Sequence, residues 1–228
     1  KGDISSIVDK RHGRELVAAG KSIRLAFFPQ NESYSWPAWE ILKKTVDAAP
    51  QAITGEVKVT VAEEGPLRAS VCVERTLGDS RFRQWITLRE GAQTDRIDLV
   101  NDIDWQSSNA LLKAEFPLSV SNPEAVYDLG VGSVSRGNNT ATAYEVYAQQ
   151  WADLYEGVHL NVTTGSEYKY TWVKTSVKPS EETTAAFREN GRIDENTYCF
   201  FITTEFVAES EWALSRSMAG NTGDCDDP

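Results

Sequence analysis

The chain has 228 residues and a net charge of −11, which argues against nucleic acid or an anionic membrane as a partner, since both require clustered Lys and Arg. No run of residues approaches the roughly 18 apolar positions of a membrane-spanning helix. The three cysteines, Cys72, Cys199 and Cys225, are widely spaced and form no CxxC or Cys/His pattern, which argues against a zinc site.

The first elements expected along the chain are short β-strands. Residues 1–10 alternate through Ile4 and Val8, and residues 23–28 form a compact apolar run. From residue 55 the period is strictly two, with valines at positions 57, 59 and 61 on one side. After a turn at residues 63–66, apolar residues return at every second position, so residues 55–73 are predicted to form a β-hairpin.

Further strands are predicted at 82–88, 97–105, 111–118, 126–134 and 144–151. In the strand predicted at 97–105 one face is apolar, while Asp98, Asp102 and Asp104 share the other face. Cys72 alternates with valines, which predicts a buried or edge thiol. Strands spaced by about ten residues, with turn signals between them, are typical of a large sandwich or barrel.

The pattern changes after residue 157. Residues 179–190 carry the clearest helix-start signal of the chain, with Ser180 as N-cap, and predict one short helix near residues 180–190. Residues 198–207 read as a strand, and the acidic tail at 220–228 is expected to be frayed. We therefore divide the chain into a sandwich domain at 1–160 and a region at 161–228, which either continues the same sandwich or forms a separate small module.

Five motifs of this sequence resemble, in the same order, motifs of the C-terminal region of the glycoside hydrolase family 38 α-mannosidases. They occupy residues 2–16, 36–41, 64–68, 103–117 and 144–154. The most distinctive is the Asp104-Trp105 pair followed by the sequence LLKAEFP, and the last motif ends in QWADL. Beyond Leu154 the match fades, so the resemblance covers about residues 1–160.

The resemblance implies an all-β fold: a large, mainly antiparallel β-sandwich, or supersandwich, of the galactose-mutarotase type. It also implies that the intact protein is a zinc-dependent retaining α-mannosidase, which hydrolyses terminal α-mannosides. In such enzymes two His and two Asp hold the zinc, and one Asp attacks the anomeric carbon. A catalytic α/β domain and a helical bundle precede the β region and carry those groups.

None of the family's metal-binding motifs occurs in this sequence, so we expect a fragment of a longer enzyme that is inactive alone. Its expected role is to brace the catalytic domain of the same chain, with zinc bound in that missing domain and no cofactor in this segment. The expected partners are an α-mannoside, bound through the full enzyme, and the catalytic domain. A soluble protein of the bacterial cytoplasm or periplasm fits these expectations.

Four residues are candidates for contact with the mannoside. Arg136 and Asn138 lie in a Gly-rich polar loop, which could reach the catalytic pocket and hydrogen-bond a substrate hydroxyl. Trp151 and Asp153 could line the interface between the domains. The alternative for the first pair is an ordinary surface turn, and the alternative for the second pair is packing in the core.

Other functional interpretations are open at this point. Asp102 and Asp104 lie two apart on one strand face and could act as paired carboxylates. The alternative is that Asp104 is a structural hydrogen-bond acceptor at a strand end and that Asp102 is solvated. His12 and His159 would have to converge on one cleft to form the acid–base site of a sandwich epimerase. A stand-alone carbohydrate-binding module would display an exposed aromatic strip that binds mannosides without another domain.

Overall fold

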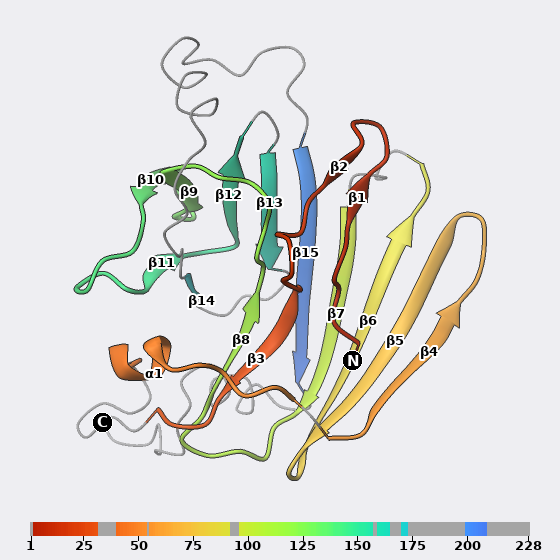
Figure 1. The fold of residues 1–228 in the computed structure, drawn as a ribbon, viewed down its shortest axis with the longest axis horizontal. Coiled ribbons are helices and arrows are strands. Elements are labelled where there is room, and N and C mark those ends of the chain that lie inside the picture. Colours follow the sequence, from red (N-terminus) through yellow and green to blue (C-terminus); the bar gives the residue numbers. More distant parts are fainter. Residues whose placement is uncertain are drawn as a thin grey trace.

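The computed structural model describes residues 2–31, 40–53, 55–91, 96–156, 159–164, 170–172 and 199–208, and the fold given below is that of these residues. Within them the backbone is mostly β-strand with one short helix, which confirms the all-β prediction (Figure 1). The helix predicted near residues 180–190 lies outside the described residues. No helix among the described residues has the length and apolar character needed to cross a membrane.

The elements of the described residues have the following bounds: β1 Val8–Asp9, β2 Arg14–Glu15, β3 Arg24–Phe28, α1 Lys43–Asp47, β4 Val57–Glu63, β5 Arg68–Leu77, β6 Ser80–Arg89, β7 Arg96–Asp104, β8 Leu111–Glu115, β9 Glu124–Asp128, β10 Ser133–Gly137, β11 Val146–Ala148, β12 Trp151–Tyr155, β13 His159–Thr164, β14 Tyr170–Trp172 and β15 Cys199–Ala208. The predicted hairpin at 55–73 is confirmed, because β4 and β5 pair antiparallel. Of the two alternatives for Cys72, a buried or an edge thiol, the structure shows the buried one.

Two predicted strands are each interrupted by a turn. The strand predicted at 126–134 is wrong, because β9 ends at Asp128 and β10 begins at Ser133. Gly130 and Gly132 lie between them with φ values of 81° and 104°, a backbone conformation that side chains with a Cβ rarely adopt. The strand predicted at 144–151 likewise separates into β11 and β12. Apolar residues continue through the first of these turns, so periodicity alone does not reveal it.

Most of the described strands form one nine-stranded sheet in the order β10-β9-β12-β13-β15-β7-β6-β5-β4. Neighbours in this sheet are antiparallel except around β15, which runs parallel to both β13 and β7. Parallel neighbours require a crossover connection of a dozen or more residues, and the long segment between β13 and β15 meets that requirement. Three two-stranded sheets accompany it: β1-β2, β3-β8 and β11-β14.

The inner face of the nine-stranded sheet carries most of the hydrophobic core. Cross-strand partners share a face, and Phe82 of β6 and Ile103 of β7 are buried partners on the inner side. The small sheets β1-β2 and β3-β8 lie over this face (Figure 1). Phe27 of β3 packs against Trp105 with ring centroids 5.8 Å apart. Two layers with apolar side chains between them define the β-sandwich that the sequence predicts.

A buried ion pair fixes the N-terminal segment onto the inner face. The Arg75 side chain is 3% exposed and donates from Nη2 to Oδ1 of Asp3 at 2.9 Å, while the Asp3 side chain is 30% exposed. Burial lowers the pKa of Arg75, and the charge of Asp3 opposes that shift. Gly2 has a φ of 81° and lies so close to Val73 that a Cβ would clash with it. Charge and close packing together hold this segment in place.

Replacement of Asp3 by Asn is expected to lower the free energy of unfolding by about 2 kcal/mol in urea denaturation at pH 7. Removing one partner of a fully buried pair costs about 3–5 kcal/mol, and the partial exposure of Asp3 reduces that loss. Asp47→Asn is the control, because Asp47 pairs with Lys43 on the surface and should cost less than about 0.5 kcal/mol. Equal losses in the two variants would contradict the role given to Asp3.

Candidate functional site

Arg136 is held in a defined position on β10. Its Nη1 donates to the carbonyl oxygen of Tyr147 at 2.9 Å, and its guanidinium lies over the ring of Tyr127 at 5.4 Å from the ring centroid. A cation above an aromatic face is attracted by the ring quadrupole. The phenol ring of Tyr127 is almost completely buried, and burial raises the pKa of its hydroxyl. The side chain of Arg136 is therefore anchored rather than freely rotating.

Asn138 follows β10 directly and is half-buried. The loop that it opens is an organised turn: the amide nitrogen of Ala143 donates to Thr140 Oγ1 at 3.0 Å, and the amide nitrogen of Thr140 donates to the Ala143 carbonyl at 3.2 Å. Asn139 Nδ2 donates to the Tyr144 carbonyl within the same loop. Side-chain hydrogen bonds of this kind stabilise turns that contain Asn and Thr.

Trp151 and Asp153 lie on β12, where Trp151 is half-buried and Asp153 is buried. The strand registers place them on the opposite side of the sheet from Arg136. Arg136 pairs with Ala125, and Tyr127 on that same face pairs with Ala152, so Asp153 next to Ala152 points the other way. Arg136 and Asn138 are two residues apart at the end of β10, and the strand registers separate Arg136 from Trp151 and Asp153.

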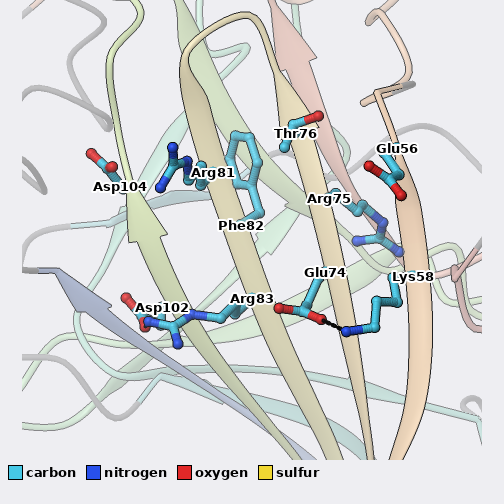
Figure 2. A pocket seen from close by; sticks show the side chains of 10 residues that line it. All are labelled: Glu56, Lys58, Glu74, Arg75, Thr76, Arg81, Phe82, Arg83, Asp102 and Asp104. Atoms are coloured by element: carbon cyan, nitrogen blue, oxygen red, sulfur yellow. Dashed lines mark hydrogen bonds and ion pairs between the residues drawn. The ribbon is translucent and has the colours of Figure 1, made fainter.

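A hollow of about 490 Å³ lies on the outer face of strands β4 to β7. Figure 2 shows that charged side chains line it, with Lys58 Nζ 3.2 Å from Glu74 Oε2. The aromatic residue among those that line it, Phe82, is buried, so the hollow offers no aromatic face on which a sugar ring could stack. The site is a surface of paired charges rather than a sugar-binding platform.

The predicted carboxylate pair lies at the rim of this hollow. Arg83 Nη2 donates to Asp102, and Gln106 Nε2 donates to Asp104 Oδ1 at 2.5 Å. Each carboxylate thus has its own structural partner (Figure 2 shows Arg83 beside Asp102). Asp104 is thus a hydrogen-bond acceptor, as the structural interpretation of the sequence expects, whereas Asp102, which that interpretation expects to be solvated, accepts from Arg83.

The described residues offer no cluster that fits zinc. Among the ranges described above, no group of three or more His, Cys, Asp or Glu side chains is placed to hold a metal ion. His12 lies in the turn between β1 and β2, with Nδ1 2.9 Å from Oδ2 of the buried Asp9. His159 is the first residue of β13 and pairs in register with Tyr155. We derive no metal-dependent step for this part of the chain.

Comparison with known proteins identifies the family. A family model described as the glycosyl hydrolases family 38 C-terminal domain matches residues 1–177. The chain belongs to this family. The family 38 domain is 29% identical over 162 residues to alpha-mannosidase 2C1 of Mus musculus and 27% identical over 162 residues to that of Homo sapiens. It is 26% identical over 167 residues to alpha-mannosidase G of Dictyostelium discoideum. Each match covers 68% of this chain but only 15% of the relative.

Sequence reasoning missed one element of this family 38 domain, an ion pair between Lys113 of β8 and Glu145 beside β11. The side chain of Lys113 is 17% exposed and that of Glu145 is 8% exposed. Burial lowers the pKa of Lys113 to about 8, whereas the nearby carboxylate of Glu115 favours the charged form. Both paired residues occur in motifs that resemble the family, which is the one signal that could have drawn attention to them.

This ion pair fixes the end of the loop that starts at Asn138. Glu145 is contacted by β8, and the neighbouring Tyr144 donates from its hydroxyl to the carbonyl oxygen of Ile41 at 2.7 Å. The loop is thus attached to the β3-β8 layer at one end and to Arg136 and β10 at the other. Its position relative to the sandwich is set by both layers.

Proposed function

We propose that this chain is the C-terminal β-domain of a zinc-dependent retaining α-mannosidase, which hydrolyses terminal α-mannosides as a whole enzyme. The domain braces the catalytic domain of the same polypeptide and contributes the loop after β10 to the mannoside pocket. The observation that carries the proposal is the family match over residues 1–177 in a chain that spans 15% of the length of its α-mannosidase relatives.

Arg136 is the side chain in this proposal that contacts the sugar. A guanidinium carries five N–H donors in a planar fork, and its bond to the Tyr147 carbonyl uses one of them. Donors in that geometry suit a pair of adjacent sugar hydroxyls. The contacts with Tyr127 and Tyr147 support this role, because a side chain that is already oriented loses little entropy when it binds a ligand.

Zinc in this proposal is bound by the catalytic domain, where it supplies Lewis-acid chemistry to the whole enzyme. The residues of the β-domain have no step in bond cleavage. They position a loop and support the catalytic domain. A domain with this role has no turnover of its own.

The test compares the 228-residue chain with the longer natural polypeptide that contains it, using an aryl α-mannoside and added zinc. Turnover is expected only from the longer polypeptide, and turnover by the chain alone would refute the non-catalytic role. In the longer polypeptide, Arg136→Gln is expected to lower kcat/KM by about tenfold or more, because a charged hydrogen bond contributes roughly 1.5–3 kcal/mol.

Arg24→Gln is the matched control for Arg136→Gln. Arg24 Nε donates to Glu115 Oε2 at 2.8 Å in a partly exposed pair on the β3-β8 layer, so its loss should leave kcat/KM unchanged. An equal loss in both variants would show that the effect of Arg136 is only structural. Calorimetric titration of the 228-residue chain with mannose and mannobiose is expected to give no heat. Heat of binding would favour a stand-alone carbohydrate-binding module.

A further inference from the structure

The inner face of the nine-stranded sheet is covered in one part and bare in another. On β7 the inner side chains from Ile97 to Ile103 are all buried. Among the inner side chains of β6, Phe82 and Gln84 are buried, Ile86 is only half-buried, and Leu88 is 53% exposed. The covered region of the inner face therefore ends between β7 and the edge strand β4.

The bare region is apolar. On β4, Val59 is 56% exposed and Val61 is 68% exposed. The registers of β4 with β5 and of β5 with β6 place Ala69 and Leu88 on the same face as these valines. Leu67, which directly precedes β5, is also exposed. We call these five residues, Val59, Val61, Leu67, Ala69 and Leu88, the apolar corner. Contiguous apolar patches of this kind mark interaction surfaces, unlike single exposed apolar residues.

Within the described residues, the cause of the exposure is a second layer that covers only part of the inner face. Nine strands form one layer, whereas the sheets that lie over its inner face, β1-β2 and β3-β8, have two strands each. The segment that covers the face next to the apolar corner is the one around Gly2, which lies against Val57 and Val73. In a polypeptide of the relatives' length, the chain would enter the domain at Gly2, beside Val57 and Val73, which lie on the same face as the apolar corner.

The edge of β4 is less suited to a partner than its face. Lys58 points to the outer side of the edge strand, and the pairing of β4 with β5 is irregular between Val61 and Glu63, consistent with a β-bulge. Edge lysines and bulges both disfavour the addition of another strand beside an edge. An occupant of the apolar corner therefore lies over the valines rather than next to them.

We infer that the apolar corner is the docking surface for an apolar segment of the longer mannosidase polypeptide, which extends the second layer of the sandwich. The inference rests on the proposed function, since it requires that the chain is part of a longer enzyme. It locates the contact by which the β-domain braces the remainder of that enzyme. The apolar corner continues the core without a break, so its occupant presents apolar side chains at β-strand spacing.

The experiment measures amide hydrogen exchange and thermal unfolding in the 228-residue chain and in the longer natural polypeptide. Peptides that contain β4 should exchange at least about tenfold more slowly in the longer polypeptide, because the strand is covered there. Val61→Asp should lower Tm of the longer polypeptide by about 5–10 °C but that of the 228-residue chain by less than about 2 °C.

Thr60→Asp is the matched control, since Thr60 is equally an exposed residue of β4 but points to the outer face. Equal Tm shifts for the two variants in the longer polypeptide would overturn the inference. Protection of β4 in the 228-residue chain would overturn it in favour of cover by another part of this chain. A dimer of the 228-residue chain that Val61→Asp dissociates would overturn it in favour of a second copy.

Hydrolysis of an aryl α-mannoside by the wild-type longer polypeptide separates this inference from the proposed function. Hydrolysis together with equal Tm shifts refutes the docking surface alone. A selective effect of Val61→Asp without any hydrolysis refutes the mannosidase function alone. If Val61→Asp prevents folding, amide exchange of β4 in the two wild-type proteins still tests the docking surface.

Discussion

Replacement of Glu145 by Gln is expected to lower the free energy of unfolding by about 3–5 kcal/mol at pH 7, measured by urea denaturation. The variant leaves the ammonium of Lys113 in a mostly buried position without its carboxylate partner. A buried charge that has lost its partner destabilises the fold by much more than the intact pair stabilised it. Hydrogen exchange of the loop that follows Asn138 should rise in the same variant, because Glu145 ties this loop to β8.

The pH dependence of this loss follows from the lysine. Burial lowers the pKa of Lys113 to about 8, and the charge of Glu115 opposes that shift. The unfolded chain keeps its proton up to the ordinary lysine pKa near 10.4, and this reference is the same for both proteins, so it cancels from the comparison. The cost of Glu145→Gln should therefore be greatest at and below pH 7, where Lys113 is charged in both proteins, and should be small above about pH 8, where Lys113 is neutral in both.

Glu74→Gln is the control for Glu145→Gln. Glu74 pairs with Lys58 at 3.2 Å on the outer face, where the two side chains are 41% and 65% exposed. Its loss should cost less than about 1 kcal/mol. A cost for Glu145→Gln as small as that, or one that does not change with pH, would contradict the structural role of the buried pair.

Phe82→Ala is expected to destabilise the domain by about 3–5 kcal/mol in the same denaturation experiment. Phe82 is 1% exposed and meets the ring of Trp105 edge-on with ring centroids 6.3 Å apart. The truncation removes buried apolar area and leaves a cavity between the two layers, in addition to the loss of the aromatic contact.

Leu88→Ala provides the comparison for Phe82→Ala, because Leu88 lies on the same strand and the same face but in the exposed apolar corner. In the 228-residue chain this truncation should cost less than about 1 kcal/mol. Comparable losses for the two variants would mean that the cover of the inner face extends further along β6 than the structure shows.

The elements that the sequence predicted well are those in which a local pattern coincides with the fold. The alternation of valines from Val57 to Val61, followed by a turn and a returning apolar row, predicts β4 and β5 because these strands form a hairpin and each has one apolar face. The turn between β9 and β10 was missed because Leu129 and Val131 continue the apolar pattern through it.

The arrangement of the candidate site could not be predicted, because it depends on registers between strands. Arg136 and Asp153 belong to β10 and β12, and only their pairing with β9 shows that they point to opposite faces. The contact between Lys113 and Glu145 joins elements of different sheets, for which no local rule exists. The resemblance to family 38 pointed to segments that contain these two residues. The relative positions of their side chains depend on how distant strands pair in the folded domain.

The position of β15 has a consequence for how the sheet is assembled. This is the last strand described along the chain, yet it lies in the interior between β13 and β7. During synthesis both neighbours emerge from the ribosome first and expose their unpaired backbone groups until β15 arrives. Contacts between residues so distant in sequence close slowly, so the nascent protein passes through a stage with two separate half-sheets. Truncation before Cys199 would make that stage permanent.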